Sequence, residues 1–239
     1  MNELLSAIRA EFRRLGTPEE EAKTRRFHKP DEQVDGYGVR APEVQRMARE
    51  AYGQVKKWPV EQRDKFCVAL LESRRHEEGA LAIYVYRRFV KQFGAREFRM
   101  FTRWLDLYVG NWGLTDGLSL WLLGGCISND PSLIGELDAW TRSKNRWKRR
   151  AAAVALEPSA SRGLHTEAVF RIATPLMTDA DVMVQKGVGW LLKETYPKKP
   201  RETMKFLLPW RASAPRLLLR YAAEKMSAAD KARVMAREN

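Results

Sequence analysis

The segment Asn111-Trp112-Gly113-Leu114-Thr115-Asp116 contains a tryptophan and an aspartate four residues apart. Asparagine is a common N-cap residue, so a helix beginning after Asn111 would carry Trp112 and Asp116 on one face. An indole beside a carboxylate can stabilise a developing positive charge and position a water molecule. From the residues alone, a core tryptophan beside a solvated aspartate remains the alternative.

A second segment is strongly basic. Between Arg142 and Arg150 there are six basic residues and no acidic one, with Trp147 among them. In a helix, Arg146 and Arg150 share a face and Arg149 lies to its side. Since a guanidinium holds two phosphate oxygens in a planar fork, the pattern favours contact with nucleic acid, and a solvated helix face is the alternative.

A third segment combines glycines with a basic and aromatic stripe. Gly187 and Gly189 interrupt a helical pattern, and each costs about 1 kcal/mol relative to alanine, which indicates close approach of another helix or a ligand. Lys186, Trp190 and Lys193 recur at i, i+4 and i+7. Core packing accounts for the tryptophan but not for the lysines beside it.

Composition narrows the class of protein. The chain has 239 residues, 44% of them hydrophobic, and a formal net charge of +13, which excludes a disordered chain and favours a polyanionic partner such as nucleic acid. Two cysteines and three scattered histidines give no cluster with metal-ligand spacing, so we expect no metal and no cofactor. The most apolar stretch, residues 118–127, is shorter than the ~20 residues that span a bilayer. We therefore expect no membrane partner and a cytoplasmic location, in the bacterial cytosol or nucleoid.

The elements that must position these segments are helices. Helical periodicity runs from the N-terminus, Thr17-Pro18 and Ala41-Pro42 each begin a further helix, and residues 30–38 form an ordered loop. Later helices are predicted over residues 60–72, 77–93, 95–108, 112–123, 131–141, 145–156, 164–176, 181–196, 200–210, 214–225 and 228–237. Short connectors favour antiparallel neighbours, so we expect an all-α fold, an α-solenoid of stacked antiparallel helix pairs (HEAT-like repeats) with a concave basic face, in one domain over residues 1–239.

At these segments the sequence resembles the AlkD-type DNA alkylation repair family, alkylpurine DNA glycosylases built from HEAT-like repeats. Four blocks carry the resemblance, in order along the chain: Phe27 with Gly38–Glu43, Asn111-Trp112-x-x-x-Asp116, Trp147-x-x-Arg150-Ala-Ala, and residues 184–193. The resemblance implies a right-handed superhelix that grips duplex DNA. It also implies hydrolysis of the N-glycosidic bond of purines alkylated at N3 or N7, leaving an abasic site, without metal, Schiff base or base flipping.

The resemblance also implies roles for single residues. Asp116 would stabilise the oxocarbenium-like sugar and orient the attacking water, and Trp112 and Trp190 would pack around the lesion. Arg150 would hold a phosphate and favour the ionised state of Asp116. The remaining expected DNA contacts are Phe27, where relatives often have tyrosine, Lys193, where arginine also occurs, and Lys186, Arg149 and Arg146.

Two other functions remain open from the sequence. One is a non-catalytic HEAT-like protein that binds DNA structures, although Asp116 and both tryptophans are present. The other is a HEAT-like protein adaptor, whose binding would be insensitive to salt, whereas binding to DNA weakens steeply as salt rises. A membrane-surface role is disfavoured because no basic amphipathic terminal helix is apparent. We expect a monomer.

Overall fold

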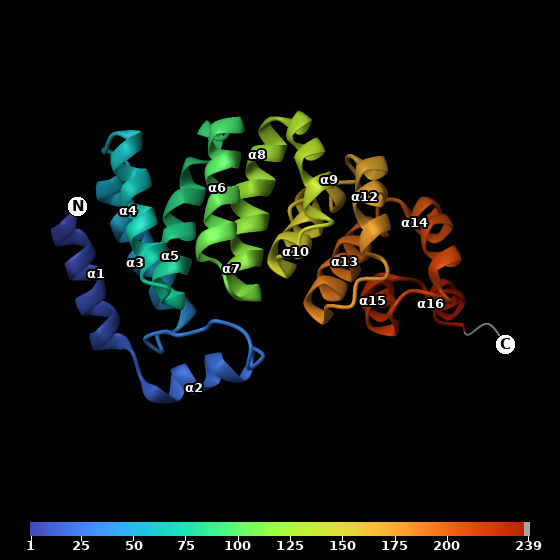
Figure 1. Cartoon of the computed structure of the whole chain (residues 1–239), viewed down its shortest axis with the longest axis horizontal. Helices are drawn as coiled ribbons and strands as arrows, with labels where there is room; N and C mark the ends of the chain where they lie inside the picture. Colours follow the sequence, from blue (N-terminus) through green and yellow to red (C-terminus); the bar gives the residue numbers. More distant parts are fainter. Residues whose placement is uncertain (237–239) are drawn as a thin grey trace. The chain divides into compact units, whose positions relative to one another are not determined.

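The computed structural model describes residues 1–236, and all the regular structure in this range is helical (Figure 1). The expected all-α fold of stacked helix pairs is therefore confirmed. By its internal contacts the chain divides into two compact units, Met1–Leu122 and Leu123–Asn239. The division falls inside a continuous helical run, so the expected single domain over residues 1–239 and its concave basic face stay predictions.

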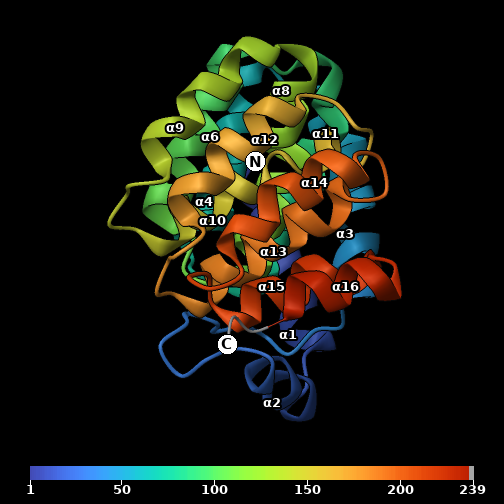
Figure 2. The ribbon, with the colours of Figure 1, turned by 90° about the vertical axis from the view of Figure 1, so that its right-hand side faces the viewer.

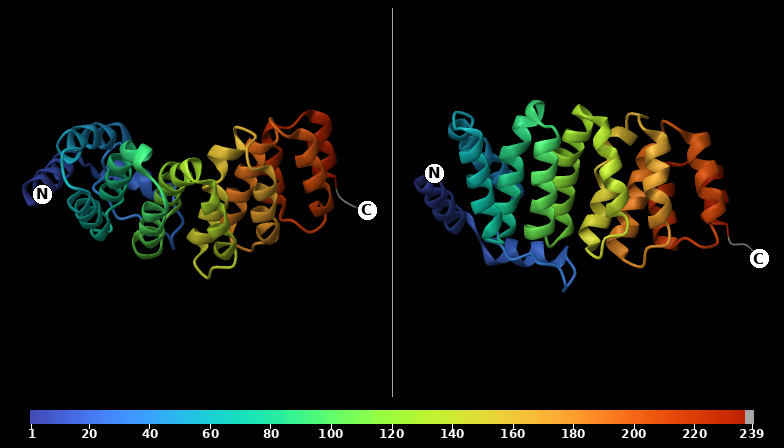
Figure 3. Two further views of the ribbon diagram at one scale, coloured as in Figure 1. Left: turned by 90° about the horizontal axis from the view of Figure 1, so that it is seen from above. Right: turned by 45° about the horizontal axis from the view of Figure 1, so that its top comes forward.

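The helices of unit 1 are connected by short turns, apart from one long loop between the second and the third. They are α1 (Asn2–Leu15), α2 (Pro18–Arg26), α3 (Ala41–Val55), α4 (Val60–Glu72), α5 (His76–Tyr86), the 3-10 helix η1 (Arg87–Gln92), α6 (Ala95–Tyr108), α7 (Trp112–Gly117) and the π-helical segment η2 (Leu118–Leu123). In this unit α5 packs against α3, α4 and α7, and α4 also packs against α6, as Figure 3 shows in two views. An aromatic cluster of Tyr86, Phe93, Phe101 and Trp104 fills the core between them.

The helices of unit 2 are shorter and several end in a 3-10 turn. They are α8 (Gly124–Asn129), η3 (Pro131–Glu136), α9 (Leu137–Trp140), α10 (Arg146–Val154), α11 (Glu157–Ala160), α12 (Thr166–Ala173), η4 (Thr174–Leu176), α13 (Val182–Thr195), α14 (Pro200–Leu207), η5 (Leu208–Trp210), α15 (Arg216–Ala222), η6 (Ala223–Lys225) and α16 (Ala228–Met235). Helix α13 is central: it packs against α10, α11 and α15 (Figure 2). Small buried side chains on α10, Ala151 to Ala153, permit this close packing.

Most predicted helices are present, and two of them, over residues 60–72 and 95–108, have the predicted bounds. The predicted helices over 164–176 and 200–210 change to 3-10 geometry at residues 174 and 208, one residue before Pro175 and Pro209, because proline lacks an N–H and clashes with the preceding helical turn. Helix 77–93 similarly becomes 3-10 at Arg87, and the short helix α11 was not predicted. Of the last prediction, residues 228–235 are helical and residue 237 lies outside the described residues.

Two general features bear on the class of protein. No helix within residues 1–236 is both long and apolar enough to cross a membrane. In the same range, no group of three or more His, Cys, Asp or Glu side chains is arranged to hold a metal ion.

Candidate functional site

The N-terminus of α7 is capped as the sequence predicts. The Asn111 side chain accepts a hydrogen bond from the backbone N–H of Leu114 at 2.9 Å and donates one to the carbonyl of Gln33 at 2.8 Å. The cap fixes where the helix begins, so Trp112 and Asp116 lie four residues apart within one helix. Asp116 is buried, with 9% of its surface exposed.

Trp112 makes three contacts with the segment that follows α2. Its Nε1–H donates to the carbonyl of Phe27 at 3.1 Å, and the backbone N–H of Trp112 donates to a carboxylate oxygen of Glu32 at 3.3 Å. The imidazole of His28 stacks on the indole, with ring centroids 5.3 Å apart. These contacts orient a half-buried indole four residues from a buried carboxylate.

Phe27 is joined to Trp112 through its backbone and not through its ring. The carbonyl of Phe27 accepts the indole N–H, whereas the side chain is 77% exposed. An apolar ring with this degree of exposure is available to stack on a ligand.

The loop between α2 and α3 is ordered by a buried carboxylate. Glu77 accepts hydrogen bonds from the backbone N–H groups of Tyr37, Gly38 and Val39 at 2.9–3.0 Å. Gly38 has φ +72° and lies where a Cβ would be 2.1 Å from a backbone oxygen, so glycine is required here. The Tyr37 hydroxyl donates to Glu78 at 2.6 Å, and burial together with this bond raises the pKa of Tyr37 to about 12. The predicted ordered loop over residues 30–38 is therefore confirmed.

Two histidines beside Trp112 belong to this site, and sequence reasoning missed them. His28 and His76 form an edge-to-face pair with centroids 5.7 Å apart. The Nδ1 of His28 is 2.9 Å from the carbonyl of Thr24, whereas its Nε2 and the Nδ1 of His76 are buried without a hydrogen-bond partner among the described residues. Burial, with a smaller effect from His28, lowers the pKa of His76. His28 and His76 are 48 positions apart in the sequence, so no local pattern predicts that they meet. The one local signal is that His28 directly follows Phe27.

In unit 2, α10 begins within one residue of the predicted start, and two of its arginines bind acids within the protein. Asn145 accepts from the backbone N–H of Trp147 at 2.9 Å. Arg149 holds Asp179 with two hydrogen bonds, at 2.7 and 3.2 Å, and both side chains are largely buried. Arg146 lies 3.4 Å from Asp181 and over the Trp147 ring. These arginines have a structural role in tying α10 to the start of α13.

The side chain of Arg150 packs against Gly187, which explains why α13 has a glycine at this position. Arg150 is 4% exposed and donates to the carbonyl of Met183. A Cβ on Gly187 would lie 3.1 Å from the Cγ of Arg150, and a Cβ on Gly189 would lie 2.5 Å from the Cβ of Tyr221 on α15. The predicted close approach at both glycines is therefore confirmed, and the approaching groups are neighbouring helices.

The basic and aromatic stripe of α13 is present on a helix capped by Asp181. Lys186 lies 5.9 Å from the ring of Tyr221, and Lys193 is ion-paired with Glu224 at 3.0 Å. Trp190 is half-buried between them. The predicted site residues thus form two groups, each within one unit. Unit 1 carries Phe27, Trp112 and Asp116, and unit 2 carries Arg146, Arg149, Arg150, Lys186, Trp190 and Lys193.

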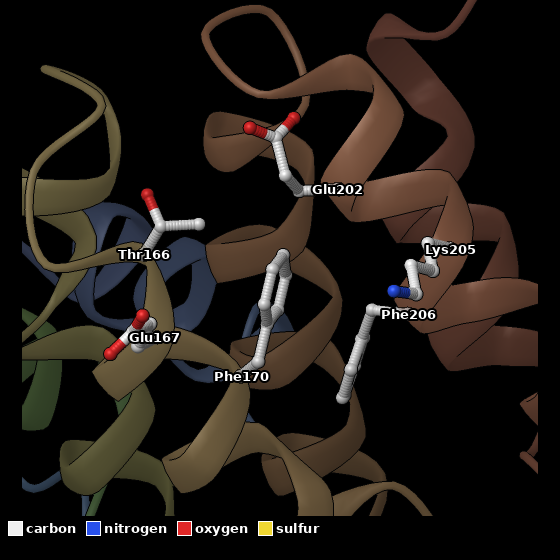
Figure 4. A pocket seen from close by; sticks show the side chains of 6 residues that line it. All are labelled: Thr166, Glu167, Phe170, Glu202, Lys205 and Phe206. Atoms are coloured by element: carbon white, nitrogen blue, oxygen red, sulfur yellow. The ribbon is translucent and has the colours of Figure 1, made fainter.

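A separate pocket in unit 2 contains none of these residues. It lies between α12 and α14, where the rings of Phe170 and Phe206 are stacked with centroids 4.7 Å apart (Figure 4). Glu167, Glu202 and Lys205 surround the rings. Its mixed charge and apolar floor distinguish it from the basic segments of α10 and α13.

Comparison with known proteins gives one family and several similar folds. Residues 8–226 match the sequence model of a protein family whose description is DNA alkylation repair enzyme. A solved structure titled as a predicted DNA alkylation repair enzyme from Enterococcus faecalis is similar with a TM-score of 0.79 and 19% identity, over 89% of this chain and 97% of that one. AlkD2 from Streptococcus mutans is similar with a TM-score of 0.61 and 21% identity, over 78% of this chain and 90% of that one. No curated protein sequence matches. At these identities the structures show a shared fold alone.

Proposed function

Since this chain belongs to the family of DNA alkylation repair enzymes, we propose that it is a DNA glycosylase that hydrolyses the N-glycosidic bond of purines alkylated at N3 or N7. The product is an abasic site in duplex DNA, and the lesion is attacked without being flipped out of the stack. The protein acts as a monomer in the cytoplasm, without metal or cofactor.

The observation that carries this proposal is the buried carboxylate of Asp116 on the same helix as the oriented indole of Trp112, four residues away. Asp116 is 9% exposed, and Trp112 is fixed by the carbonyl of Phe27 and the ring of His28. A carboxylate with little access to water stabilises nearby positive charge more strongly than an exposed one. The indole adds an electron-rich face to the same environment.

The proposed reaction needs little from the protein besides this stabilisation. An alkylated purine already carries positive charge, so the glycosidic bond breaks with its electron pair going to the base, which leaves as a neutral molecule. Positive charge then develops on the deoxyribose, where Asp116 stabilises it. Water attacks the sugar carbon and loses a proton, with Asp116 orienting the water and accepting the proton. The products are the free base and an abasic sugar.

Binding of the duplex is assigned to the other predicted residues. Arg150 is proposed to hold a phosphate, which requires its guanidinium, 4% exposed and bonded to the carbonyl of Met183, to become accessible to the DNA. Trp190 is proposed to pack beside the damaged nucleotide. Lys186 and the exposed ring of Phe27 are proposed further contacts. Arg146, Arg149 and Lys193 have acidic partners within the protein, so contact with a phosphate requires them to share or exchange these partners.

The test measures base release from duplex DNA that contains 7-methylguanine. Released base is quantified by chromatography, and abasic sites are scored by strand cleavage after alkali. Asp116→Asn is expected to lose excision by about 100-fold or more, as removal of a transition-state-stabilising group does, while it retains DNA binding. Glu61→Gln, which also removes one negative charge from unit 1 but at an exposed position, is the matched control with parental activity.

Three outcomes separate the functions that the sequence leaves open. Equal excision by the parent and by Asp116→Asn rejects the assignment of Asp116. Salt-sensitive duplex binding, without release of 7-methylguanine, 3-methyladenine or a bulky alkylated purine, assigns a non-catalytic DNA-binding protein. Absence of duplex binding at low salt rejects the DNA partner altogether and favours the adaptor.

A further inference from the structure

An arginine in unit 1 that belongs to none of the predicted DNA contacts lies against two aromatic rings. The guanidinium carbon of Arg87, in η1, is 4.7 Å from the ring centroid of Tyr84 on α5 and 4.5 Å from that of Trp121 in η2. The two rings are themselves 5.3 Å apart and tilted by 34°. All three side chains are half-buried, so the cluster reaches the surface of the unit.

The next residue repeats the arrangement. Arg88 lies over the ring of Tyr52 on α3, with its guanidinium carbon 5.1 Å from the centroid. Two adjacent arginines therefore both rest on aromatic rings at the surface that α3, α5 and η2 form. We call Tyr84, Arg87, Arg88 and Trp121 the Arg87 cluster.

These two arginines have no acidic partner within residues 1–236. Other arginines of the same unit do: Arg9 pairs with Glu78, Arg46 with Glu43, and Arg96 with Glu97. Burial, together with the neighbouring charge of Arg88, lowers the pKa of Arg87. The positive charge is thus partly desolvated here, and no carboxylate within residues 1–236 balances it. An anion that bound here would supply the missing negative charge and be stabilised.

The shape of the cluster selects among anions. The rings contact the guanidinium and hold its orientation, which leaves its N–H groups to bind a ligand. A guanidinium held in this way loses little conformational entropy when it forms its planar fork with two oxygens, and phosphate has the geometry to accept it.

One member of the cluster, Trp121, lies on the same helical run as the proposed catalytic carboxylate. A Cβ on Gly117, the residue after Asp116, would be 3.4 Å from the ring of Trp121. Trp121 is five residues beyond Asp116 in a continuous helical segment. Successive nucleotides of one strand advance by about 3.4 Å along the duplex axis. Trp121 thus joins Arg87 to the turn that carries Asp116, so the ligand expected at the cluster is a phosphate that flanks the damaged nucleotide.

We propose that Arg87, supported by Tyr84 and Trp121 and assisted by Arg88, binds a backbone phosphate of DNA near the damaged nucleotide. This inference rests on the proposed function, because it takes duplex DNA as the ligand. It adds a phosphate site in unit 1 that neither the charge pattern nor the family resemblance assigns.

The test compares the salt dependence of duplex binding, measured by fluorescence anisotropy between 50 and 200 mM salt, which is about the range where phosphate contacts dominate affinity. Arg87→Gln is expected to weaken binding and to reduce the slope of log K against log salt by about 0.9, the value for one lost phosphate contact. Arg87→Lys keeps the charge and therefore the slope, but binds more weakly because the fork is lost. Arg99→Gln, an exposed arginine on α6, is the matched control and leaves both quantities unchanged.

Three further results decide against the inference or separate it from the proposed function. An unchanged slope for Arg87→Gln, in a variant whose circular dichroism matches the parent, overturns the phosphate site even if the parent excises bases. Another result would be calorimetric evidence that inorganic phosphate binds in a way that depends on Arg87, while the slope of log K against log salt for DNA is unchanged in Arg87→Gln. That result also overturns the DNA-phosphate site and assigns a site for free phosphate. A reduced slope in a protein that releases no base supports the phosphate site and contradicts the glycosylase.

Discussion

The imidazole of His28 stacks on the indole of Trp112, with ring centroids 5.3 Å apart and planes at 21° to each other. His28 follows α2 and Trp112 begins α7, so this contact joins the loop after α2 to the helix that carries Asp116. The indole N–H is also bonded to the carbonyl of Phe27. The loop therefore determines the orientation of the indole in the candidate site.

Removal of this stack tests whether His28 positions Trp112. An aromatic pair of this kind contributes about 0.5–1.5 kcal/mol, so His28→Ala is expected to reduce base release at saturating DNA by about two- to tenfold. His28→Phe keeps a ring against the indole and is expected to restore most of the rate. Single-turnover excision by both variants measures this. Equal losses in His28→Ala and His28→Phe would show that the stack is not the cause.

His76 predicts a pH dependence of stability. Burial lowers the pKa of His76 in the folded protein below the unfolded value of about 6.5. The unfolded chain then binds a proton more readily, so stability is undiminished above this pH and falls as the pH decreases below it, until the folded protein is protonated too. Two groups face this ring: the carboxylate of Glu77, which raises its pKa, and His28, which lowers it.

Urea denaturation of the parent and of His76→Gln at pH 7 and pH 5 measures this contribution. The parent is expected to lose more stability between the two pH values than the variant, because the variant lacks the group that binds the proton. The carboxylates that both proteins share cancel in the comparison. An equal loss of stability between pH 7 and pH 5 in both proteins would show that His76 does not cause the pH dependence.

Arg149 separates a structural from a DNA-binding role for the basic run. Arg149→Ala leaves the carboxylate of Asp179 buried and unpaired, which is expected to cost about 2–4 kcal/mol of unfolding free energy. Arg142→Ala, an exposed change in the same run, should stay within about 0.5 kcal/mol of the parent. Chemical denaturation of both variants checks this. If Arg149→Ala had unchanged stability and a smaller slope of log K for DNA binding against log salt, Arg149 would be assigned a contact with DNA instead.

Two glycines in helices predict opposite effects of the same substitution. A Cβ on Gly189 would be 2.5 Å from the Cβ of Tyr221 and 2.8 Å from the carbonyl oxygen of Leu218, so Gly189→Ala must separate α13 from α15 and is expected to destabilise by about 1–3 kcal/mol. A Cβ on Gly53 in α3 has nothing within 4 Å, so Gly53→Ala is expected to stabilise by about 0.5–1 kcal/mol. Thermal unfolding of the two variants compares them, and a shift of the same sign in both would contradict the packing argument.

Local patterns were sufficient to predict the helices and several of their ends. Asn111 and Thr17, which the sequence places at the start of a helix, each accept a hydrogen bond from a backbone N–H of the helix that follows. The Glu20 side chain does not return a hydrogen bond to Thr17 and instead accepts one from Lys23 at 2.6 Å. The register of Trp112 and Asp116 also follows from sequence, because it depends on hydrogen bonds between residues close along the chain.

Only the tertiary structure decided which charged and aromatic groups meet. The sequence suggested Arg149 as a phosphate contact, but Asp179, 30 residues away, occupies its guanidinium. Phe27 reaches Trp112 across 85 residues, through a backbone carbonyl that no side-chain pattern encodes. The sequence by itself determined an all-α chain, the helix starts at Thr17 and Asn111, the basic charge and the placement of Trp112 and Asp116 four residues apart in one helix, because these depend on local periodicity and composition. The tertiary structure decided the stack of His28 on Trp112, the cluster around Arg87 and the internal partners of α10, because each joins residues from helices that meet only when the chain packs.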